Sequence, residues 1–219
     1  DEAADGLMMY AVSGDETNVV RELLESLRRD FNGEEYTRRL ESRVRGEGYT
    51  DLGIPGGTTT LMAAMMVTSP EIVTMLLEFG ANVQSVDIMG NDAFMLASVF
   101  GRHDNLQCWF ERVKEYDLEK CNSVLGATSI FVAVNMGSNK FDNVRVLLKQ
   151  GARVDAMTHS GFSVLIAACA NEDSDPKVVK AILELYDRVG DLGLVGGINY
   201  RIQSQTAKWK LLRGTAKLV

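Results

Sequence analysis

Two stretches of this chain carry apolar residues three and four positions apart. The apolar positions of the first stretch are Ile72, Val73, Leu76 and Leu77. This spacing predicts an amphipathic helix, and the glycine that follows at Gly80 predicts its end. The second stretch, 143–150, has similar spacing and meets Gly151 in the same way. Both stretches share the pattern Leu-Leu-x-x-Gly-Ala-x-Val, which indicates a repeated structural unit.

A second pattern, Gly-x-Thr-x-apolar-x-x-Ala, occurs four times with Thr, Asp or Ser at the third position. The copies are 57–64, 90–97, 126–133 and 161–168, and their glycines are 33, 36 and 35 residues apart. The glycine suits a turn that needs a positive φ. The oxygen-bearing side chain two positions later can cap the helix that follows. Each copy therefore predicts a turn and a first helix, and the Leu-Leu stretches supply a second helix.

These copies resemble the ankyrin repeat family, whose period is about 33 residues and whose hallmark is Thr-Pro-Leu-His-x-Ala. The match covers the Gly, Thr-like, Leu-like and Ala positions and the Leu-Leu-x-x-Gly-Ala ending. No copy keeps the proline or the histidine. The histidine position holds Met62, Met95, Phe131 and Ile166. The resemblance implies an all-α, ankyrin-type helix-turn-helix repeat solenoid with short β-turn or hairpin loops, in which stacked units share one core.

We expect one ankyrin-repeat domain over residues 1–219. Its units are expected at about 5–27, 57–85, 90–122, 126–155 and 161–187, with a helix-and-loop insertion at 28–56 and a modified C-terminal cap at 188–219. The first unit departs from the pattern because Tyr10 takes the alanine position. The insertion is either a solvated elaboration or a contact for a partner, since insertions in repeat arrays map to loops and often to the binding face.

Charge and cysteine content narrow the function classes. The net charge of -7 argues against a general nucleic-acid binder. The three cysteines form no Cys-x-x-Cys pair, so neither a zinc site nor a disulfide framework is expected, and reduced thiols favour a cytoplasmic location. No apolar run has the roughly 20 residues of a membrane span. The chain opens at Asp1 without a signal peptide, which suggests a fragment or a processed form.

The C-terminal segment is basic against an acidic remainder. From Arg201 onward it holds Arg201, Lys208, Lys210, Arg213 and Lys217 and no Asp or Glu. Such a cluster can attract anionic lipid, but the cap of a repeat array also needs a polar outer face. We favour the cap, and a membrane contact stays the less favoured alternative.

No catalytic, cofactor-binding or metal-binding residue is predicted. The Gly-rich segment 190–197 lacks the Lys-Ser or Lys-Thr of a phosphate loop. His103 and His159 fall at separate turns, where a surface position is the simpler interpretation. Neither a Gly-x-Ser-x-Gly elbow nor a His-Glu-x-x-His helix occurs. The chain is therefore expected not to be an enzyme.

The family resemblance implies a concave face made of hairpin tips and the exposed side of each first helix. Transferred by register, the partner-binding positions are Met66, Val67, Ile88, Met89, Val99, Phe100, Asn135, Met136, Met157 and His159. Many of them are apolar, and an exposed apolar strip marks an interaction site. The expected partner is another protein, which would present an apolar segment or an amphipathic helix. The alternative is that Met66 and Phe100 pack inside the stack.

Two modes of action stay open. The chain is expected to be a protein-interaction module that binds a partner in trans, as a scaffold or adaptor does. It could instead be the regulatory ankyrin domain of a larger enzyme or channel, with its groove filled in cis. Its oligomeric state is not predicted by the sequence.

Overall fold

The computed structural model describes residues 2–44, 48–49, 54–136, 140–170 and 175–189. Its helices are α1 (Glu2–Ser13), α2 (Thr17–Asp30), α3 (Gly33–Leu40), α4 (Thr60–Val67), α5 (Pro70–Glu78), α6 (Ala93–Phe100), α7 (His103–Arg112), α8 (Ser129–Asn135), α9 (Lys140–Lys149), α10 (Val164–Ala170) and α11 (Pro176–Val189). One short antiparallel pair, β1 (Gly48–Tyr49) with β2 (Ile54–Pro55), accompanies them. The predicted all-α class is confirmed, because helices make up nearly all regular structure in these ranges.

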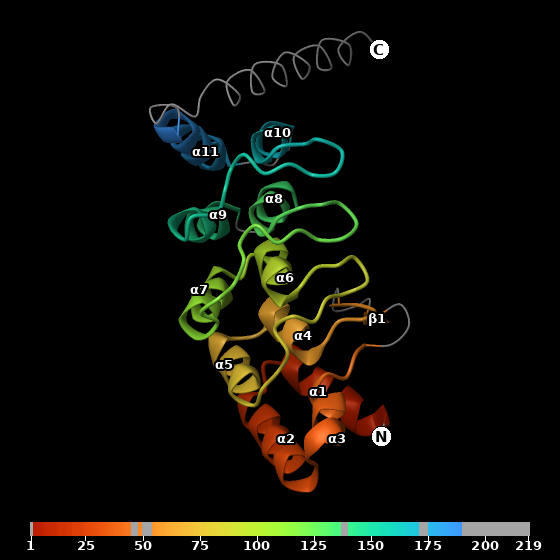
Figure 1. The fold of residues 1–219 in the computed structure, drawn as a ribbon. Coiled ribbons are helices and arrows are strands. Elements are labelled where there is room, and N and C mark those ends of the chain that lie inside the picture. The colour runs from red at the N-terminus through yellow and green to blue at the C-terminus, as the bar shows by residue number, and fades with distance from the viewer. Residues whose placement is uncertain (1, 45–47, 50–53, 137–139, 171–174, 190–219) are drawn as a thin grey trace.

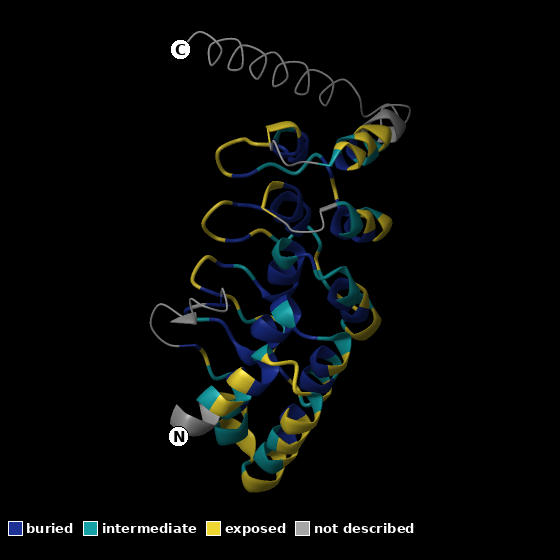
Figure 2. Cartoon of the chain, turned by 180° about the vertical axis from the view of Figure 1, so that it is seen from behind, coloured by how far each residue is buried: buried dark blue, intermediate teal, exposed yellow. Residues whose placement is uncertain are grey.

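The helices form two parallel rows (Figure 1). The first row runs α1, α4, α6, α8 and α10, and the second runs α2, α5, α7, α9 and α11, with each helix packed on the next in its row. Each first helix also packs on the second helix of its own pair. Loops project from one side of the first row, away from the second row (Figure 1). The core lies between the two rows and along the first row (Figure 2).

The first helices begin where the repeated pattern predicts. Thr59 Oγ1 accepts a hydrogen bond from the Met62 backbone N–H at 3.3 Å, which caps α4. Asp92 caps α6 in the same way, accepting from Met95 N at 2.9 Å. Further along the chain, Ser163 Oγ accepts from Ile166 N at 3.3 Å at the start of α10. α8 differs, because its N-cap Thr128 makes no side-chain capping bond.

The Leu-Leu-x-x-Gly-Ala pattern closes the second helices. After α5, Gly80 N donates to Leu77 O at 3.1 Å and Ala81 N to Leu76 O at 3.0 Å. These two bonds define a Schellman ending, which requires a left-handed residue at the glycine position. Gly80 has φ +90°, a value that costs a side-chain-bearing residue energy. The same two bonds and the same φ recur at the end of α9, around Gly151.

The first helices are buried almost all round because each lies between two neighbours of its own row and also has the second row on one side and the hairpin loops on the other (Figure 1). In α4 every residue from Thr60 to Met66 is buried, and in α6 every residue from Ala93 to Ser98 is buried. Small side chains such as Ala64 and Ala97 let these helices approach closely. The second helices bury one face only, which in α5 is formed by Ile72, Val73 and Leu76. The pattern of apolar residues along the chain thus follows the number of covered faces.

Two buried asparagines join successive helix pairs. Asn105 in α7 is fully buried, and its Nδ2 donates to Thr68 O at 3.0 Å and to Met65 O at 3.3 Å. Both carbonyls lie at the end of α4, where helical hydrogen bonding has run out. Asn143 in α9 donates to Ser98 O at 2.8 Å, at the end of α6. These side chains satisfy the C-terminal carbonyls of the preceding first helix, a role that sequence analysis did not identify.

The segment predicted as an insertion divides into a helix and a hairpin arm. α3 packs on α2, and Tyr36 anchors it by donating its hydroxyl to Phe79 O at 2.6 Å. Beyond α3, Arg43 forms a β-bridge with Thr59, while β1 and β2 pair Gly48 with Pro55 further out. The end of the segment therefore lies on the same side of the molecule as the other hairpins (Figure 1).

Most of the predicted C-terminal cap lies outside the described residues. α11 continues to Val189, so the start of the expected cap is helical. The basic segment from Arg201 onward belongs to residues that the structure does not describe.

Candidate functional site

Three hairpins with equivalent geometry leave the first row at 86–92, 121–128 and 157–163. Each is closed by one β-bridge, formed by the pairs Val86–Asp92, Cys121–Thr128 and Met157–Ser163. The Arg43–Thr59 bridge occupies the corresponding place before α4. The bridged residue at the end of each arm is the N-cap position of the following first helix. A hairpin and a helix start are therefore built as one piece.

A polar side chain inside each hairpin shapes its tip. Asp87 Oδ1 accepts from Met89 N and Asn91 N, both at 2.8 Å. Asn122 Oδ1 takes the same place in the next hairpin and accepts two backbone N–H groups at 3.1 Å. In the third hairpin, Thr158 Oγ1 accepts from Phe162 N at 3.1 Å. Because these side chains supply the turn's hydrogen bonds, the tip residues are free to vary.

Hydrogen bonds between neighbouring hairpins hold them in one row. Arg43 Nη1 donates to Val86 O at 2.7 Å, which ties the first arm to the second hairpin. Ser123 Oγ donates to Met89 O at 3.3 Å. His159 N donates to Leu125 O at 2.9 Å, which joins the last two hairpins. The tips are therefore linked to one another, and in both ribbon views the loops project in one row from the same side of the molecule (Figures 1 and 2).

Exposed apolar side chains lie on this row, which we call the hairpin ridge. Its members are Ile88, Met89, Val124, Leu125 and Phe162. Ile88 is the most open of them, at 74% exposure, and Phe162 retains 51%. Met136, at the end of α8, is 59% exposed. Large apolar side chains that stay exposed on three neighbouring hairpins are typical of an interaction surface.

The structure places the ten residues predicted to face a partner in three environments. Five are exposed: Ile88, Met89, Asn135, Met136 and His159. Four are half-buried: Val67, Val99, Phe100 and Met157. Met66 is 2% exposed, so its predicted place in a groove is wrong.

Burial of Met66 has a simple cause. It lies in the last turn of α4, a helix packed between α1 and α6, and the packing of both neighbours closes the space around it. Val99 and Phe100 in the last turn of α6 also pack against the core, which leaves them only partly open. The stretch at the ends of the first helices is therefore less exposed than register alone predicts, and the ridge carries most of the open apolar surface.

Sequence analysis did not select Val124, Leu125 or Phe162. One signal for the first two was present, because the spacing from Gly90 to Gly126 is 36 residues. The hairpin at 121–128 places three residues between Asn122 and its glycine, where the other two hairpins place two. The additional residue enlarges an apolar tip. No comparable signal marked Phe162.

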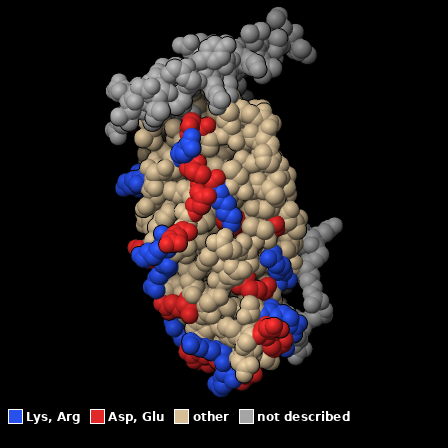
Figure 3. All heavy atoms as spheres, in the orientation of Figure 1, with Lys and Arg blue, Asp and Glu red and all other residues tan. Residues whose placement is uncertain are grey.

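Charged side chains concentrate elsewhere. In the face shown in Figure 3 they follow the second row of helices and the N-terminal helices, while the side from which the last two hairpins project is mostly uncharged. On the second row, Arg21 pairs with Glu71 at 3.1 Å and Arg112 with Glu78 at 2.8 Å. Arg21, Glu71 and Glu78 line an open, mainly acidic cleft between α5 and α7. The two sides of the molecule therefore offer different chemistry.

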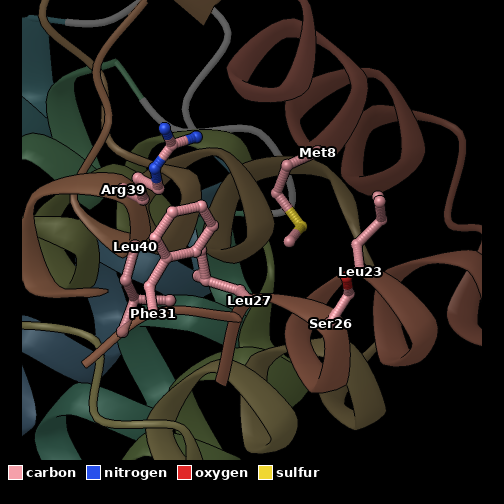
Figure 4. A pocket seen from close by; sticks show the side chains of 7 residues that line it. All are labelled: Met8, Leu23, Ser26, Leu27, Phe31, Arg39 and Leu40. Carbon is pink, nitrogen blue, oxygen red and sulfur yellow. The ribbon is translucent and has the colours of Figure 1, made fainter. Parts of the chain in front are cut away.

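A small apolar pocket lies between α1, α2 and α3 (Figure 4). Its cavity volume is about 110 Å³, and its lining consists of Met8, Leu23, Ser26, Leu27, Phe31, Arg39 and Leu40. The Arg39 guanidinium lies 4.1 Å from the centre of the Phe31 ring. It also meets Glu35 at 2.7 Å. Hydrogen bonds from Arg38 and Arg39 lower the pKa of Glu35 to about 2, so this carboxylate stays charged and fixes the pocket wall.

One buried polar cluster is structural in character. Asp92 is fully buried, and its carboxylate meets Tyr116 Oη at 3.0 Å and Lys120 Nζ at 2.9 Å. Burial, followed by the neighbouring Asp92 carboxylate, raises the pKa of Tyr116, so its hydroxyl remains a donor. Asp92 is the N-cap residue of α6, and Tyr116 and Lys120 belong to the loop after α7, so these contacts fix that loop against the start of α6. Asp92 itself is closed off from solvent, with an exposure of 0%.

Within the described residues, no group of three or more His, Cys, Asp and Glu side chains could hold a metal ion. His103 begins α7 and His159 lies on a hairpin tip, so the two histidines belong to different elements. Among the described helices, none has both the length and the apolar character needed to cross a membrane.

Comparison with known proteins gives one partial match. The chain is 35% identical over 116 residues to the B-cell lymphoma 3 protein homolog of Mus musculus. The match covers 52% of this chain and 25% of the relative, so the chain spans about a quarter of that protein's length. This similarity to an ankyrin-repeat protein suggests ankyrin-like repeats in the shared stretch. No family model matches the chain.

Proposed function

We propose that this chain is a divergent ankyrin-repeat domain that binds another protein through the hairpin ridge and the adjoining end of α8. The observation that carries the proposal is the row of exposed apolar side chains on consecutive, hydrogen-bonded hairpins. The partial similarity to an ankyrin-repeat protein supports a protein-interaction role. The assignment of a non-catalytic module rests on that similarity and on the absence of sequence motifs for catalysis.

The spacing of the ridge favours a helical ligand segment. Helices in contact lie about 8–10 Å apart, so successive hairpins repeat at roughly that distance. Two turns of an α-helix rise by about 10.8 Å. An amphipathic helix laid along the row could therefore place an apolar side chain on Met89, the next on Leu125 and a third beside Phe162. Methionine suits such a contact because its unbranched side chain adapts to the shape it meets.

The test uses two acidic substitutions on the ridge and a matched substitution elsewhere. Met89→Glu with Leu125→Glu places charge on two exposed tips, so the fold is expected to persist while binding is lost. Leu183→Glu is the control, since Leu183 is similarly exposed but belongs to α11 in the second row. Circular dichroism first establishes that each variant is folded.

Affinity capture from cell extract, followed by binding measurements with the purified captured protein, then separates the outcomes. Binding by the parent and by Leu183→Glu, together with at least a roughly tenfold loss in the ridge variant, supports the proposal. Equal binding by the parent and the ridge variant contradicts it. A partner lost only in Leu183→Glu would move the site to the second row.

A further inference from the structure

The turn between α4 and α5 holds the dipeptide Ser69-Pro70. The chain has three prolines, and the other two follow Ile54 and Asp175. Ser69 is therefore the one Ser or Thr in the chain that precedes a proline. Ser-Pro is the minimal recognition element of proline-directed protein kinases, which transfer a phosphoryl group to the serine hydroxyl.

Ser-Pro before a helix has a common structural explanation, which this site does not follow. Serine is favoured as an N-cap and proline as the first helical residue. Here Pro70 does begin α5, but the Ser69 side chain accepts no hydrogen bond from the helix backbone. The Ser69 hydroxyl instead donates to Asp15 Oδ1 at 2.9 Å, at the molecular surface. The serine is thus not needed to cap α5, and the residue is partly exposed to solvent.

Asp15 is held in place to make this contact. It accepts two hydrogen bonds on one oxygen, from Ser69 Oγ and from Ser69 N, each at 2.9 Å. Among the described residues it is the non-glycine residue with a positive φ, at +55°. Asp15 is the left-handed residue in the turn that terminates α1, and Gly101 has the same role after α6. An aspartate tolerates this conformation better than most residues, though less well than glycine. The contact joins the first helix pair to the second.

We propose that Ser69 is a phosphorylation site and that its phosphate breaks the contact with Asp15. The Ser69 oxygen attacks the γ-phosphorus of ATP, and a new O–P bond forms. The bond from the γ-phosphorus to the bridging oxygen breaks, ADP leaves, and the hydroxyl proton passes to the kinase's base. Ser69 Oγ then has no hydrogen to donate. The phosphate, with a charge of about -1.5 to -2, then lies beside the Asp15 carboxylate, in the place of the hydroxyl that had donated to it.

The surrounding charges favour separation of Asp15 from the phosphate. Arg21 is already paired with Glu71 at 3.1 Å, two residues after Ser69. Arg102 already donates to the Thr68 carbonyl and pairs with Asp104 at 3.1 Å. Both guanidinium groups already have a carboxylate partner, which partly offsets their attraction for the phosphate, whereas Asp15 Oδ1 lies 2.9 Å from the serine oxygen that carries it. The repulsion therefore loosens the turn between α1 and α2, which leads into the helices that form the apolar pocket.

The first measurement is phosphate incorporation by the whole chain. The parent is incubated with a proline-directed kinase and ATP, and the product is weighed by mass spectrometry. One phosphate on the parent is expected, with none on Ser69→Ala and none on Pro70→Ala, which keeps the hydroxyl but removes the recognition element. No incorporation by the folded chain, while a peptide of residues 64–75 is phosphorylated, overturns the assignment.

The second measurement is amide hydrogen exchange of residues 13–17, whose N–H groups close the turn after α1. Phosphorylation is expected to speed this exchange roughly tenfold and to leave α8 unchanged. In Asp15→Asn, where no carboxylate opposes the phosphate, the acceleration is expected to fall to within about twofold. Unchanged or slower exchange in the phosphorylated parent overturns the release of Asp15, as does an equal acceleration in Asp15→Asn.

Discussion

The amide of Asn105 gives the sharpest test of how successive helix pairs are joined. Its Nδ2 donates to Thr68 O and Met65 O, and Thr68 O has a second donor in Arg102. Asn105→Ala therefore removes these two bonds and a longer one to Ala64 O at 3.4 Å, and it leaves the Met65 carbonyl without the donor that Asn105 supplies. A buried group left unsatisfied costs about 1–3 kcal/mol, so we expect a loss of about 2 kcal/mol in the free energy of unfolding.

Asn105→Asp separates the role of the donor from that of side-chain volume. Aspartate has the same shape, but it replaces the Nδ2 donor with an oxygen that faces carbonyl oxygens in a fully buried site. It should therefore cost more than alanine, about 3–4 kcal/mol, because a buried unpaired charge or acceptor adds to the lost bonds. Gln107→Ala on the exposed face of the same helix is the control and should change stability by less than about 0.5 kcal/mol.

Urea unfolding followed by far-ultraviolet circular dichroism measures each difference. The order parent, Ala, Asp from most to least stable is the expected result. If Asn105→Asp is as stable as the parent, the amide does not donate to the end of α4 and the reasoning is refuted. If Asn105→Ala matches Gln107→Ala, these hydrogen bonds do not contribute to the junction.

Three further outcomes can be measured on the same protein. Gly126→Ala should destabilise the protein more than Gly151→Ala. Both glycines have a positive φ, but of the two only Gly126 has the His159 ring within 2.3 Å of an added Cβ. Adding His159→Ala to Gly126→Ala should abolish this difference in stability, as measured by urea unfolding. The carboxyl of Glu35 should titrate with a midpoint of about 2 when followed by carbon NMR. Its contribution to stability is therefore present above pH 4.5 and is lost as the pH falls towards 2. A midpoint near the ordinary value of 4.5 would contradict the two arginine contacts. Tyr116 should stay protonated at pH values where an exposed tyrosine ionises, because its pKa is raised in the folded protein. Its contribution to the free energy of unfolding is therefore present below pH 10.0 and is lost as the pH rises above that value. Tyr116→Phe should remove this contribution to the pH dependence and cost about 1–2 kcal/mol at neutral pH.

Local features of the fold were predictable because their causes lie within a few residues of sequence. The caps at Thr59, Asp92 and Ser163 depend on a side chain three residues from its partner N–H. The glycine endings after α5 and α9 depend on bonds that span six residues. Both signals are present although the four copies contain neither the proline nor the histidine of the ankyrin hallmark.

Exposure was predicted less well because it depends on neighbours that the register cannot show. In the aligned repeats, Met66 and Phe100 occupy the same positions as exposed residues at the end of α8. Nevertheless α6 covers Met66, and packing against the core half-buries Phe100. Phe162 lay in a position held by Asn91 and Ala127 in the other hairpins, so its type carried no functional signal. Asn105 and Asn143 looked like ordinary polar residues of an amphipathic helix.

The sequence by itself determined the helices, their ends and their repetition, since hydrogen-bonded caps and apolar spacing act over single turns. The tertiary structure decided which apolar residues became core and which stayed in water, because burial depends on how many faces of a helix are covered by other helices and by hairpins. It also decided that the hairpins form one surface, through contacts between residues more than thirty positions apart, such as Ser123 and Met89. The link from Asp15 to Ser69 is of the same kind: no local pattern predicts a carboxylate that meets a serine 54 residues away.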